Sequence, residues 1–286
     1  MTRPPPLLTT VNHDRDIAGM THVYPVVSRR ARGVSVGINL NPNNACNWRC
    51  IYCQVPGLKR GGPPPIDLAL LEDELRRMLE DVLRGDFMAR AVPEGMRRLN
   101  DVALSGNGEP TSAGEFPAVV RLVGRVLADF GLAGEIKLVL ITNGSLSHKP
   151  AVQTGLRAMA ALGGEVWFKF DRATREGLAL VNDTETDPEA HFRRLGRVAE
   201  LCPTWVQTCL FSLDGTPPAE QEVEAYVDML RRARTEIPTL GGVLLYGLAR
   251  PSLQPEASRL GRLPQGWLEN LAGRIEALGL PVRVDP

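Results

Sequence analysis

The sequence predicts an α/β protein in which a parallel sheet is covered by helices. Strand-like and helix-like segments alternate through six units after residue 33. The strand-like runs are almost continuously apolar, which is typical of parallel strands buried on both faces. Polar and glycine-rich residues follow the ends of these runs, where parallel α/β folds place their functional sites.

Six segments rich in Val, Leu, Ile or aromatic residues are the expected strands. They span 34–40, 99–105, 136–142, 165–170, 205–211 and 242–246. Segments with apolar residues at three- and four-residue spacing separate them, and these are the expected helices. They span 67–84, 115–130, 151–162, 188–201, 219–235 and 263–278. Each strand is therefore followed by a helix, and right-handed crossovers are expected to connect the strands.

Three segments lie outside this alternation. Residues 1–33 hold a run of three prolines and are expected to form an irregular N-terminal extension over the core domain, which spans 34–286. The connection 41–66 carries three cysteines, and the connection 247–264 is expected to close over the substrate mouth as a lid. Connections of such length in a compact domain usually carry function.

Composition excludes several classes of protein. The 286 residues include 33 basic and 33 acidic side chains, and 43% of them are hydrophobic, which excludes a disordered chain, a collagen-like repeat and a disulfide scaffold. A net charge of zero removes the broad basic field of a typical nucleic-acid binder. No apolar run approaches the roughly 18 residues of a membrane span, and the start MTRPPPLL lacks a secretory h-region. We expect a cytoplasmic protein without membrane partners.

The sheet has two possible architectures at this stage. A closed eight-stranded barrel would need two more strand–helix units, so the alternatives are an open six-stranded barrel and a doubly wound sheet. The special residues follow the ends of the first four expected strands. In a barrel they would meet at one rim, whereas a doubly wound sheet would spread them along an edge.

Three cysteines form the spacing C-x3-C-x2-C in the string NACNWRCIYCQ. Cys46, Cys50 and Cys53 lie within eight residues, and thiolates so close together suit one compact metal centre. Structural zinc is the alternative, but it normally takes four ligands, and no fourth Cys or His follows at short spacing. The other two cysteines, Cys202 and Cys209, are expected to be buried small hydrophobic residues, and all five are expected to be free thiols in a reducing compartment.

An iron–sulfur cube held by three thiolates has one iron without a protein ligand. Such a cube normally takes four cysteines, and an open coordination position is how a metal site binds a reactant. A saturated cluster would instead indicate an electron-transfer protein, which is the alternative from a different functional class.

The cysteine spacing, with Tyr52 directly before the last cysteine, resembles the signature of the radical S-adenosylmethionine (SAM) superfamily. The resemblance implies that Cys46, Cys50 and Cys53 hold one [4Fe-4S] cluster and that SAM chelates the fourth iron. It also implies that an electron from the cluster cleaves SAM to a 5′-deoxyadenosyl radical, which abstracts hydrogen from a substrate. The fold it implies is the partial (β/α)6 barrel.

The string SGNGEPT follows the second expected strand. Gly106 and Gly108 permit a close approach of the backbone to a ligand, and Glu109 can accept a hydrogen bond from an ammonium group. Taken alone, this string is equally consistent with an ordinary turn. It resembles the glycine-rich motif that holds the SAM amino group in the family, with Asn107 in place of the middle glycine. The resemblance therefore implies that these four residues bind SAM.

Further candidates follow the later strands. Asn143, in the string ITNG, is expected near the methionyl or ribose end of SAM, the alternative being an Asn-Gly turn. Lys169 and Asp171 alternate with bulky apolar residues in VWFKFD, so they share one face of a strand. Either they form structural ion pairs, or they line the cofactor and substrate cavity. Asp171 is a cofactor-binding candidate, and Lys169, Asp171 and Arg250 are the catalytic candidates, with Gln207 as a further candidate.

The strings from residues 24 to 250 resemble one branch of the superfamily, which contains the tRNA 4-demethylwyosine synthases and their uncharacterised bacterial relatives. Those synthases carry extra upstream cysteines, but this chain has no cysteine before Cys46, so it can support one cluster. They also use a lysine to form a Schiff base with pyruvate, for which Lys59 and Lys169 are the options. A tRNA is thus the second choice of substrate, and a small molecule or peptide remains open. Family analogy implies a flavodoxin or ferredoxin as the low-potential electron donor.

Overall fold

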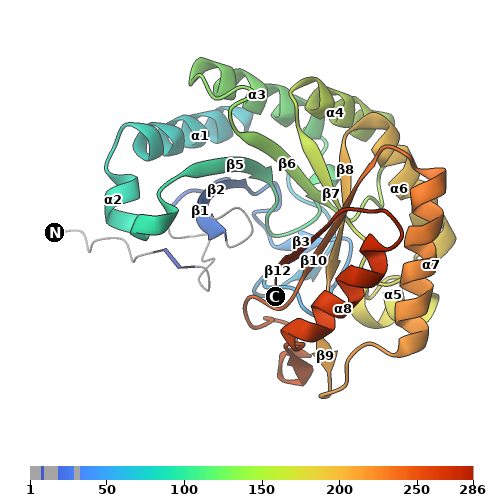
Figure 1. Ribbon diagram of the computed structural model, residues 1–286. Coiled ribbons are helices and arrows are strands. Elements are labelled where there is room, and N and C mark those ends of the chain that lie inside the picture. Colours follow the sequence, from blue (N-terminus) through green and yellow to red (C-terminus); the bar gives the residue numbers. More distant parts are fainter. Residues whose placement is uncertain (1–7, 10–18, 29–32, 286) are drawn as a thin grey trace.

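A computed structural model describes residues 8–9, 19–28 and 33–285, and an eight-stranded sheet forms its centre (Figure 1). Seven strands run parallel, and the first runs antiparallel to its neighbour. In spatial order the strands are β1 (Val23–Ser28), β2 (Gly33–Ile38), β5 (Leu99–Leu104), β6 (Lys137–Thr142), β7 (Glu165–Lys169), β8 (Thr204–Cys209), β10 (Leu240–Tyr246) and β12 (Val282–Asp285).

The order of the strands excludes the doubly wound alternative. From β2 to β12 the neighbours in the sheet follow the chain order without a reversal, whereas a doubly wound sheet reverses direction at a switch point. In the described strands, β1 and β12 are the two ends of the sheet and do not pair. The fold is therefore an open half-barrel, as the sequence predicted.

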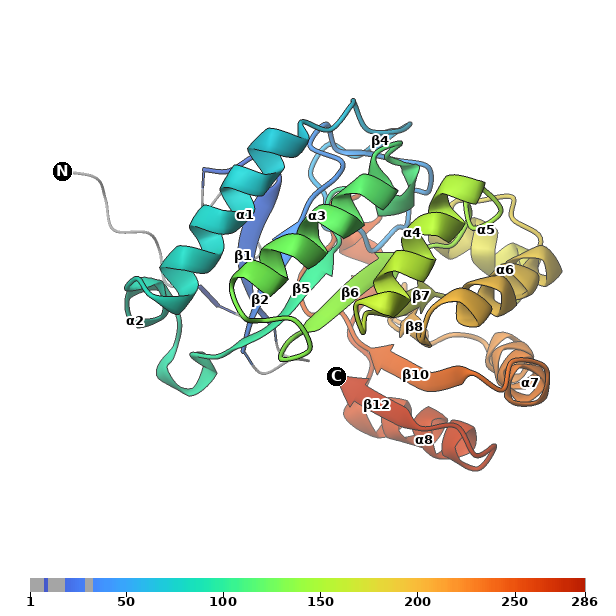
Figure 2. The ribbon, with the colours of Figure 1, turned by 90° about the horizontal axis from the view of Figure 1, so that it is seen from above.

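Helices cover the outer face of the curved sheet (Figure 2). A continuous apolar core lies between the two layers and includes the fully buried Phe116, Phe168 and Phe170. The inner face of the sheet is thus left to line a cavity. The helices are α1 (Leu68–Leu83), α2 (Phe87–Ala91), α3 (Phe116–Asp129), α4 (Pro150–Ala161), α5 (Arg175–Asn182), α6 (Pro188–Leu201), α7 (Glu220–Glu236) and α8 (Gln265–Glu276).

The six predicted strands and six predicted helices are all present, with ends within about two residues. Local chemistry explains this agreement, because apolar spacing and caps are short-range signals. Asp67, for example, accepts hydrogen bonds from the N–H groups of Ala69 and Leu70 and so begins α1, as an N-cap carboxylate does.

The prediction that residues 1–33 are wholly irregular is wrong for residues 23–28. These residues form β1, which pairs antiparallel with β2 along its full length. Pro25 lies within β1, and this is possible because β1 is an edge strand, where the missing N–H of proline is tolerated. Residues 1–7, 10–18 and 29–32 lie outside the described part of the chain.

Several short elements were missing from the prediction, and two of them border or contact the site. The strand β12 has only four residues, and its alternating Val and charged residues give too short a pattern to recognise. The helix α5 is one of the shortest, with Thr174 as its N-cap. Both elements matter below, because β12 borders the cavity and α5 contacts the cysteine segment.

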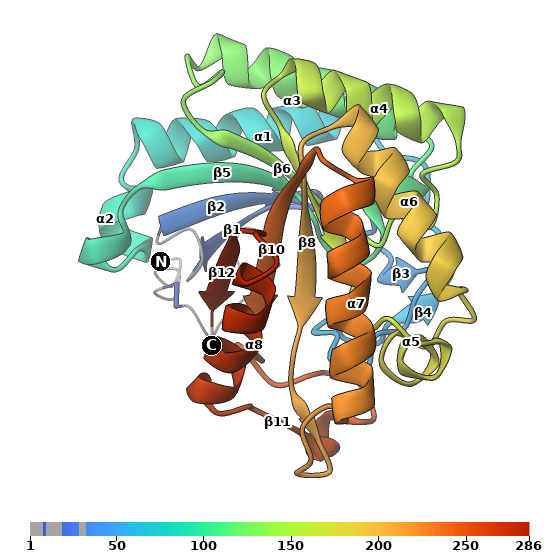
Figure 3. The same cartoon turned by 45° about the vertical axis from the view of Figure 1, so that its right-hand side comes forward.

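Segment 41–66 leaves the sheet after β2 and folds beside α5 (Figure 3). It contains two short strands, β3 (Ala45–Cys46) and β4 (Lys59–Arg60), that pair with each other. Later in the chain β9 (Ser212–Leu213) pairs with β11 (Leu260–Gly261), which ties the segment 247–264 to the end of β8. Across the described ranges, none of the helices is both long enough and apolar enough to span a bilayer.

Candidate metal centre and cofactor pocket

A cavity of about 290 Å³ lies inside the curve of the sheet, near the carboxyl ends of the strands. All three clustered cysteines border it, together with the glycine-rich segment 105–109 and residues 247–250. The tertiary structure thus gathers at one rim residues that follow several different strands. This is the arrangement expected of a barrel, in which strand ends converge.

The cysteine segment is held against the rest of the chain by its backbone. The carbonyl oxygen of Cys53 accepts hydrogen bonds from Leu253 N (2.9 Å), Ser252 Oγ (3.1 Å) and Gln254 Nε2 (3.2 Å). Ile51 N donates to the Val181 carbonyl at 2.9 Å. The segment 247–264, for which a lid role stays a prediction, therefore braces the cysteine loop.

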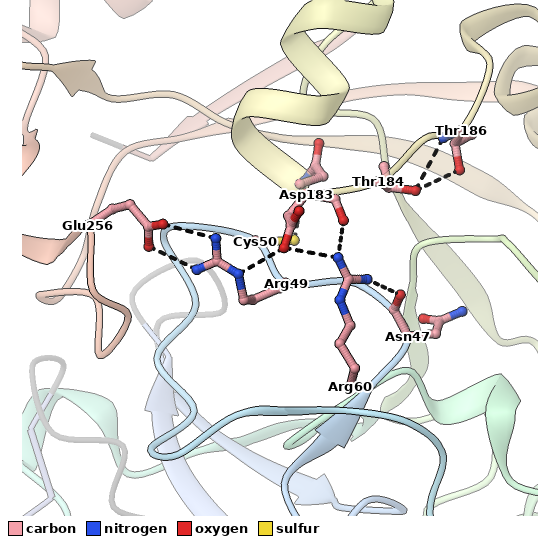
Figure 4. A network of polar contacts seen from close by, with 9 residues as sticks. Asn47, Arg49, Cys50, Arg60, Asp183, Thr184, Thr186 and Glu256 are labelled. Carbon is pink, nitrogen blue, oxygen red and sulfur yellow. Dashed lines mark hydrogen bonds and ion pairs between the residues drawn. The ribbon is translucent and has the colours of Figure 1, made fainter.

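Two arginines join the cysteine segment to its neighbours (Figure 4). Arg49 pairs with Asp183 (2.8 Å) and with Glu256 (2.9 Å), and Arg60 pairs with Asp183 (3.0 Å). The guanidinium of Arg49 holds the pKa of both Asp183 and Glu256 below its ordinary value. These pairs are partly exposed, so each contributes little to stability, but together they fix the orientation of the loop.

Two of the three clustered thiols, Cys46 and Cys50, lie where burial favours the neutral form. Burial raises the pKa of Cys46 to about 11 and that of Cys50 to about 12. Neutral thiols are therefore favoured unless a metal supplies the compensating charge. Among the residues that the structure describes, no three His, Cys, Asp or Glu side chains form a ready site for one metal ion. Three soft ligands around a cavity fit a cluster of several irons better than one zinc ion.

The two glycines of segment 105–109 are required by close packing. Gly106 has a φ of +146°, and a Cβ there would lie 2.5 Å from Asn39 Oδ1. A Cβ on Gly108 would lie 2.1 Å from the carbonyl oxygen of Ala45, in the cysteine segment. Asn107 donates from its backbone to Asn39 Oδ1 (3.0 Å) and from its side chain to Asn44 Oδ1 (2.6 Å). The glycines thus let this loop lie directly against the proposed metal centre.

Glu109 is buried and already accepts four hydrogen bonds. Its Oε1 accepts from the backbone N–H and hydroxyl of Thr111 and from the hydroxyl of Thr142, and its Oε2 accepts from Asn143 N at 2.7 Å. Burial raises the pKa of Glu109, and these hydrogen bonds oppose that effect. Because Oε2 has a single donor among the described residues, it keeps the capacity to accept a bond from a ligand.

Asn143 joins the third strand end to the cysteine segment. Its side chain donates to Asn47 Oδ1 (2.9 Å), and Asn47 in turn donates to Ser145 Oγ (2.7 Å). Asn143 also lines the cavity. Asn143 therefore links Glu109 to the cysteine segment through Asn47, and its predicted role in binding SAM stays a prediction.

Lys169 lies at the centre of a buried polar group. Its Nζ donates to Tyr52 Oη (2.8 Å) and lies 3.4 Å from Tyr246 Oη, and Tyr52 donates to Asp171 Oδ2 at 2.5 Å. Burial lowers the pKa of Lys169, but the acidic groups of Tyr246, Asp171 and Cys50 raise it more, so the net shift is upward. The acidic neighbours therefore favour the ammonium form of Lys169.

The remaining candidates take different positions. Asp171 does not border the cavity; it is buried behind Tyr52 and accepts from Tyr52, from Asn182 Nδ2 (2.7 Å) and from Cys209 N (2.8 Å). From this position Asp171 orients the side chains of Tyr52 and Asn182. Arg250 and Gln207 do border the cavity. Cys202 and Cys209 are buried free thiols, as predicted, and Cys209 also reaches the cavity wall.

Sequence reasoning missed the residues that support the site from behind. Asn182 donates to Cys50 Sγ at 3.2 Å, and Asn39 orders the glycine loop through its side-chain oxygen. The sequence could have indicated Asn39, because it is a polar residue at the end of an expected strand. Asn182 lies 132 residues from Cys50 in a helix that was not predicted, so no local pattern could have indicated it.

Comparison with known sequences finds relatives that match only part of this chain. No family model matches the chain. Two UPF0026 proteins from strains of Helicobacter pylori are each 30% identical over 138 residues. The match takes in 46% of this chain and only 38% of the relatives. A protein named GTPase Obg from Brachyspira hyodysenteriae is 26% identical over 152 residues, which is 20% of its length, but this chain has no G-x-x-x-x-G-K-[ST] phosphate-binding sequence.

Comparison of structures identifies the class of fold. A radical SAM methyltransferase from Sphaerobacter thermophilus gives a TM-score of 0.53, with 14% identity over 88% of this chain and 66% of its own. HydG, a maturase of the [FeFe]-hydrogenase, gives 0.55 with 12% identity over 85% and 48%. SuiB from Streptococcus suis, bound to S-adenosylmethionine, gives 0.52 with 11% identity over 87% and 45%. The chain therefore has the partial barrel fold of radical SAM enzymes.

Proposed function

We propose that this chain is a radical SAM enzyme with one [4Fe-4S] cluster. Cys46, Cys50 and Cys53 would hold the cluster, and no other cysteine of the chain belongs to their loop. The observation that carries the proposal is that the three clustered thiols and the glycine-rich segment 105–109 border one cavity. The fold supports it, because the structures it is similar to include a radical SAM methyltransferase and a protein bound to SAM.

The chain's own residues bind and orient the cofactor. Gly106 and Gly108 let the backbone approach the SAM methionyl group, Glu109 Oε2 accepts from its ammonium, and Asn143 and Tyr52 line the same pocket. When bound, the cluster and SAM supply the reductive cleavage that yields the 5′-deoxyadenosyl radical. The sheet and the segment 247–264 exclude water and hold one substrate C–H bond at close range.

The substrate would occupy the inner face of the half-barrel. Trp167 and Gln207 border the cavity there, as do Asp101 and Asp285. The side-chain oxygen of Gln207 is buried and has no hydrogen-bond partner among the described residues, so a bound molecule that donates to it would satisfy the group. Lys169 and Arg250 would bind acidic or carbonyl groups of a substrate.

A tRNA-modifying activity of the 4-demethylwyosine synthase type is the second candidate. It is favoured by the resemblance of the strings between residues 24 and 250. That chemistry needs a neutral lysine to form a Schiff base. The raised pKa of Lys169 opposes this role, and Lys59 is exposed on β4. A small molecule or a peptide is therefore the preferred substrate class.

The electron that starts the reaction must come from a second protein. We propose a donor of the flavodoxin or ferredoxin type, acting in the reducing cytoplasm. The free state of all five cysteines supports a reducing compartment.

Anaerobic reconstitution with iron and sulfide tests the proposed function. The wild-type chain should bind about four irons, change its cluster spectrum on addition of SAM, and release 5′-deoxyadenosine when reduced. Cys50→Ala should abolish all three, because it removes one of three ligands. Cys202→Ala is the matched control, since that buried thiol lies away from the cavity. Iron without any response to SAM would favour electron transfer, and zinc without iron would favour a structural module.

A further inference from the structure

Asn182 makes a direct contact with one of the three cysteines. It is the last residue of α5 and is completely buried. Its Nδ2 lies 3.2 Å from Cys50 Sγ and 2.7 Å from Asp171 Oδ2. One amide nitrogen thus serves two acceptors, and one of them is a proposed ligand sulfur.

The amide of Asn182 can adopt only one orientation. Its NH₂ group carries two donors and faces two acceptors, whereas a reversed amide would set Oδ1 against the Asp171 carboxylate. Asp171 is itself held in place by Tyr52 Oη and Cys209 N. An N–H of Asn182 therefore points at the sulfur of Cys50.

The position of Asn182 relative to the cysteine loop is also fixed. Arg49 N donates to the Asn182 carbonyl at 3.2 Å, and the next residue, Asp183, pairs with both Arg49 and Arg60 (Figure 4). The residue before it, Val181, accepts from Ile51 N. Three consecutive residues at the end of α5 thus bind the loop on both sides of Cys50.

We infer that Asn182 is a positioning residue that raises the reduction potential of the cluster through Cys50. This inference rests on the proposed function. Reduction adds negative charge to a cluster and its thiolates, and an N–H dipole aimed at a ligand sulfur stabilises that charge. Hydrogen bonds to the sulfurs are one of the means by which proteins set cluster potentials, and burial makes such a bond stronger. The contact brings the cluster within reach of a biological low-potential donor.

The test is a redox titration of the reconstituted Asn182→Leu protein, followed by electron paramagnetic resonance in the absence of SAM. Leucine branches at the same carbon as asparagine, although it is larger, and it removes the donor. The midpoint potential is expected to shift to a more negative value than in the wild type. A residue that only filled space would leave the potential unchanged.

Asn47→Leu is the matched control. Asn47 is next to Cys46, but it turns its oxygen toward the sulfur, at 3.9 Å, and uses its nitrogen for Ser145. It therefore offers that sulfur no N–H donor, and its replacement should cause no negative shift. Equal negative shifts in both variants would overturn the inference.

The outcomes separate this inference from the proposed function. If Asn182→Leu binds four irons and cleaves SAM but keeps the wild-type potential, the inference is overturned and the function stands. If the wild-type chain takes up no iron, both are overturned. Should the variant fail to retain its cluster, a second measurement decides. Pulsed electron paramagnetic resonance is recorded on the reduced wild type and on reduced Asn47→Leu, both labelled with ¹⁵N in the asparagine side-chain amides. A ¹⁵N coupling to the cluster that is present in both proteins supports the hydrogen bond from Asn182, and absence of this coupling from the wild type overturns the inference.

Discussion

His191 shows how one buried residue can make stability depend on pH. Its Nε2 contacts the carbonyl oxygen of Lys169 at 2.9 Å, and its ring packs against Trp48, Phe168 and Phe170. Burial lowers the pKa of His191 to about 4, although the bond to the Lys169 carbonyl acts in the opposite direction. The folded protein therefore keeps this imidazole neutral at pH values where the unfolded chain protonates it.

The sign of the effect follows from linkage. Between the unfolded pKa of about 6.5 and the folded pKa, the unfolded state binds more protons, so stability falls as the pH falls. We expect His191 to account for a loss of roughly 2 kcal/mol in the free energy of unfolding of the cluster-free protein between pH 7.5 and pH 5. In His191→Phe the loss over the same interval should be smaller by that amount, as urea unfolding at the two pH values would measure. Equal losses in the two proteins would contradict this explanation.

At the scale of elements, β1 depends on a carboxylate from a helix. Glu74 of α1 is buried and accepts hydrogen bonds from the N–H groups of Thr21 (2.7 Å), His22 (2.7 Å) and Val23 (3.2 Å). These groups precede or begin the edge strand that the sequence did not predict. The helix thus orders the entry into β1, and β1 carries Tyr24 and Val26 to the cavity wall.

Replacing Glu74 should weaken this strand selectively. Glu74→Leu leaves buried N–H groups without a partner, and we expect it to cost about 2–3 kcal/mol of unfolding free energy. Faster amide exchange at residues 21–28 should accompany the loss. Glu72→Leu is the control on the same helix, because Glu72 forms a partly exposed ion pair with Arg76, worth about 1 kcal/mol or less. The role assigned to Glu74 is wrong if Glu74→Leu and Glu72→Leu lower the free energy of unfolding by the same amount.

At the scale of the whole molecule, the fold separates stability from the site. The apolar core lies between the helices and the outer face of the sheet, whereas the cysteines border the cavity on the inner face. Loss of the proposed metal centre should therefore leave the half-barrel folded. Because the fold does not depend on the site, binding of SAM can be measured as a change in thermal stability, without a substrate.

SAM is expected to stabilise the cluster-loaded protein against heat. A ligand at 100 times its dissociation constant adds about 2.7 kcal/mol, which corresponds to a rise in Tm of about 4–5 °C for a chain of this size. Cys50→Ala should unfold near the Tm of the cluster-free wild type and show no rise with SAM, because the iron that SAM chelates is absent. Scanning calorimetry under anaerobic conditions measures both. A rise with SAM in the variant would mean that binding does not need the cluster.

Local patterns along the chain were enough to predict the six strand–helix units and the cluster of three cysteines. Apolar periodicity, helix caps and the C-x3-C-x2-C string act over fewer than about 20 residues, so they can be read directly from the chain. The same holds for the glycine-rich string 105–109, although the sequence could not say that Gly108 needs to be glycine because Ala45 lies against it.

Tertiary structure alone decided which distant residues meet. The strands β1 and β12 complete the sheet through pairing with neighbours, and short segments of this kind carry too little pattern to predict. Asp171 was expected to line the pocket, but the fold places it behind Tyr52, where it orients Asn182 toward Cys50. Such contacts join positions more than 100 residues apart, and no local preference encodes them, because they exist only after the chain has closed its half-barrel.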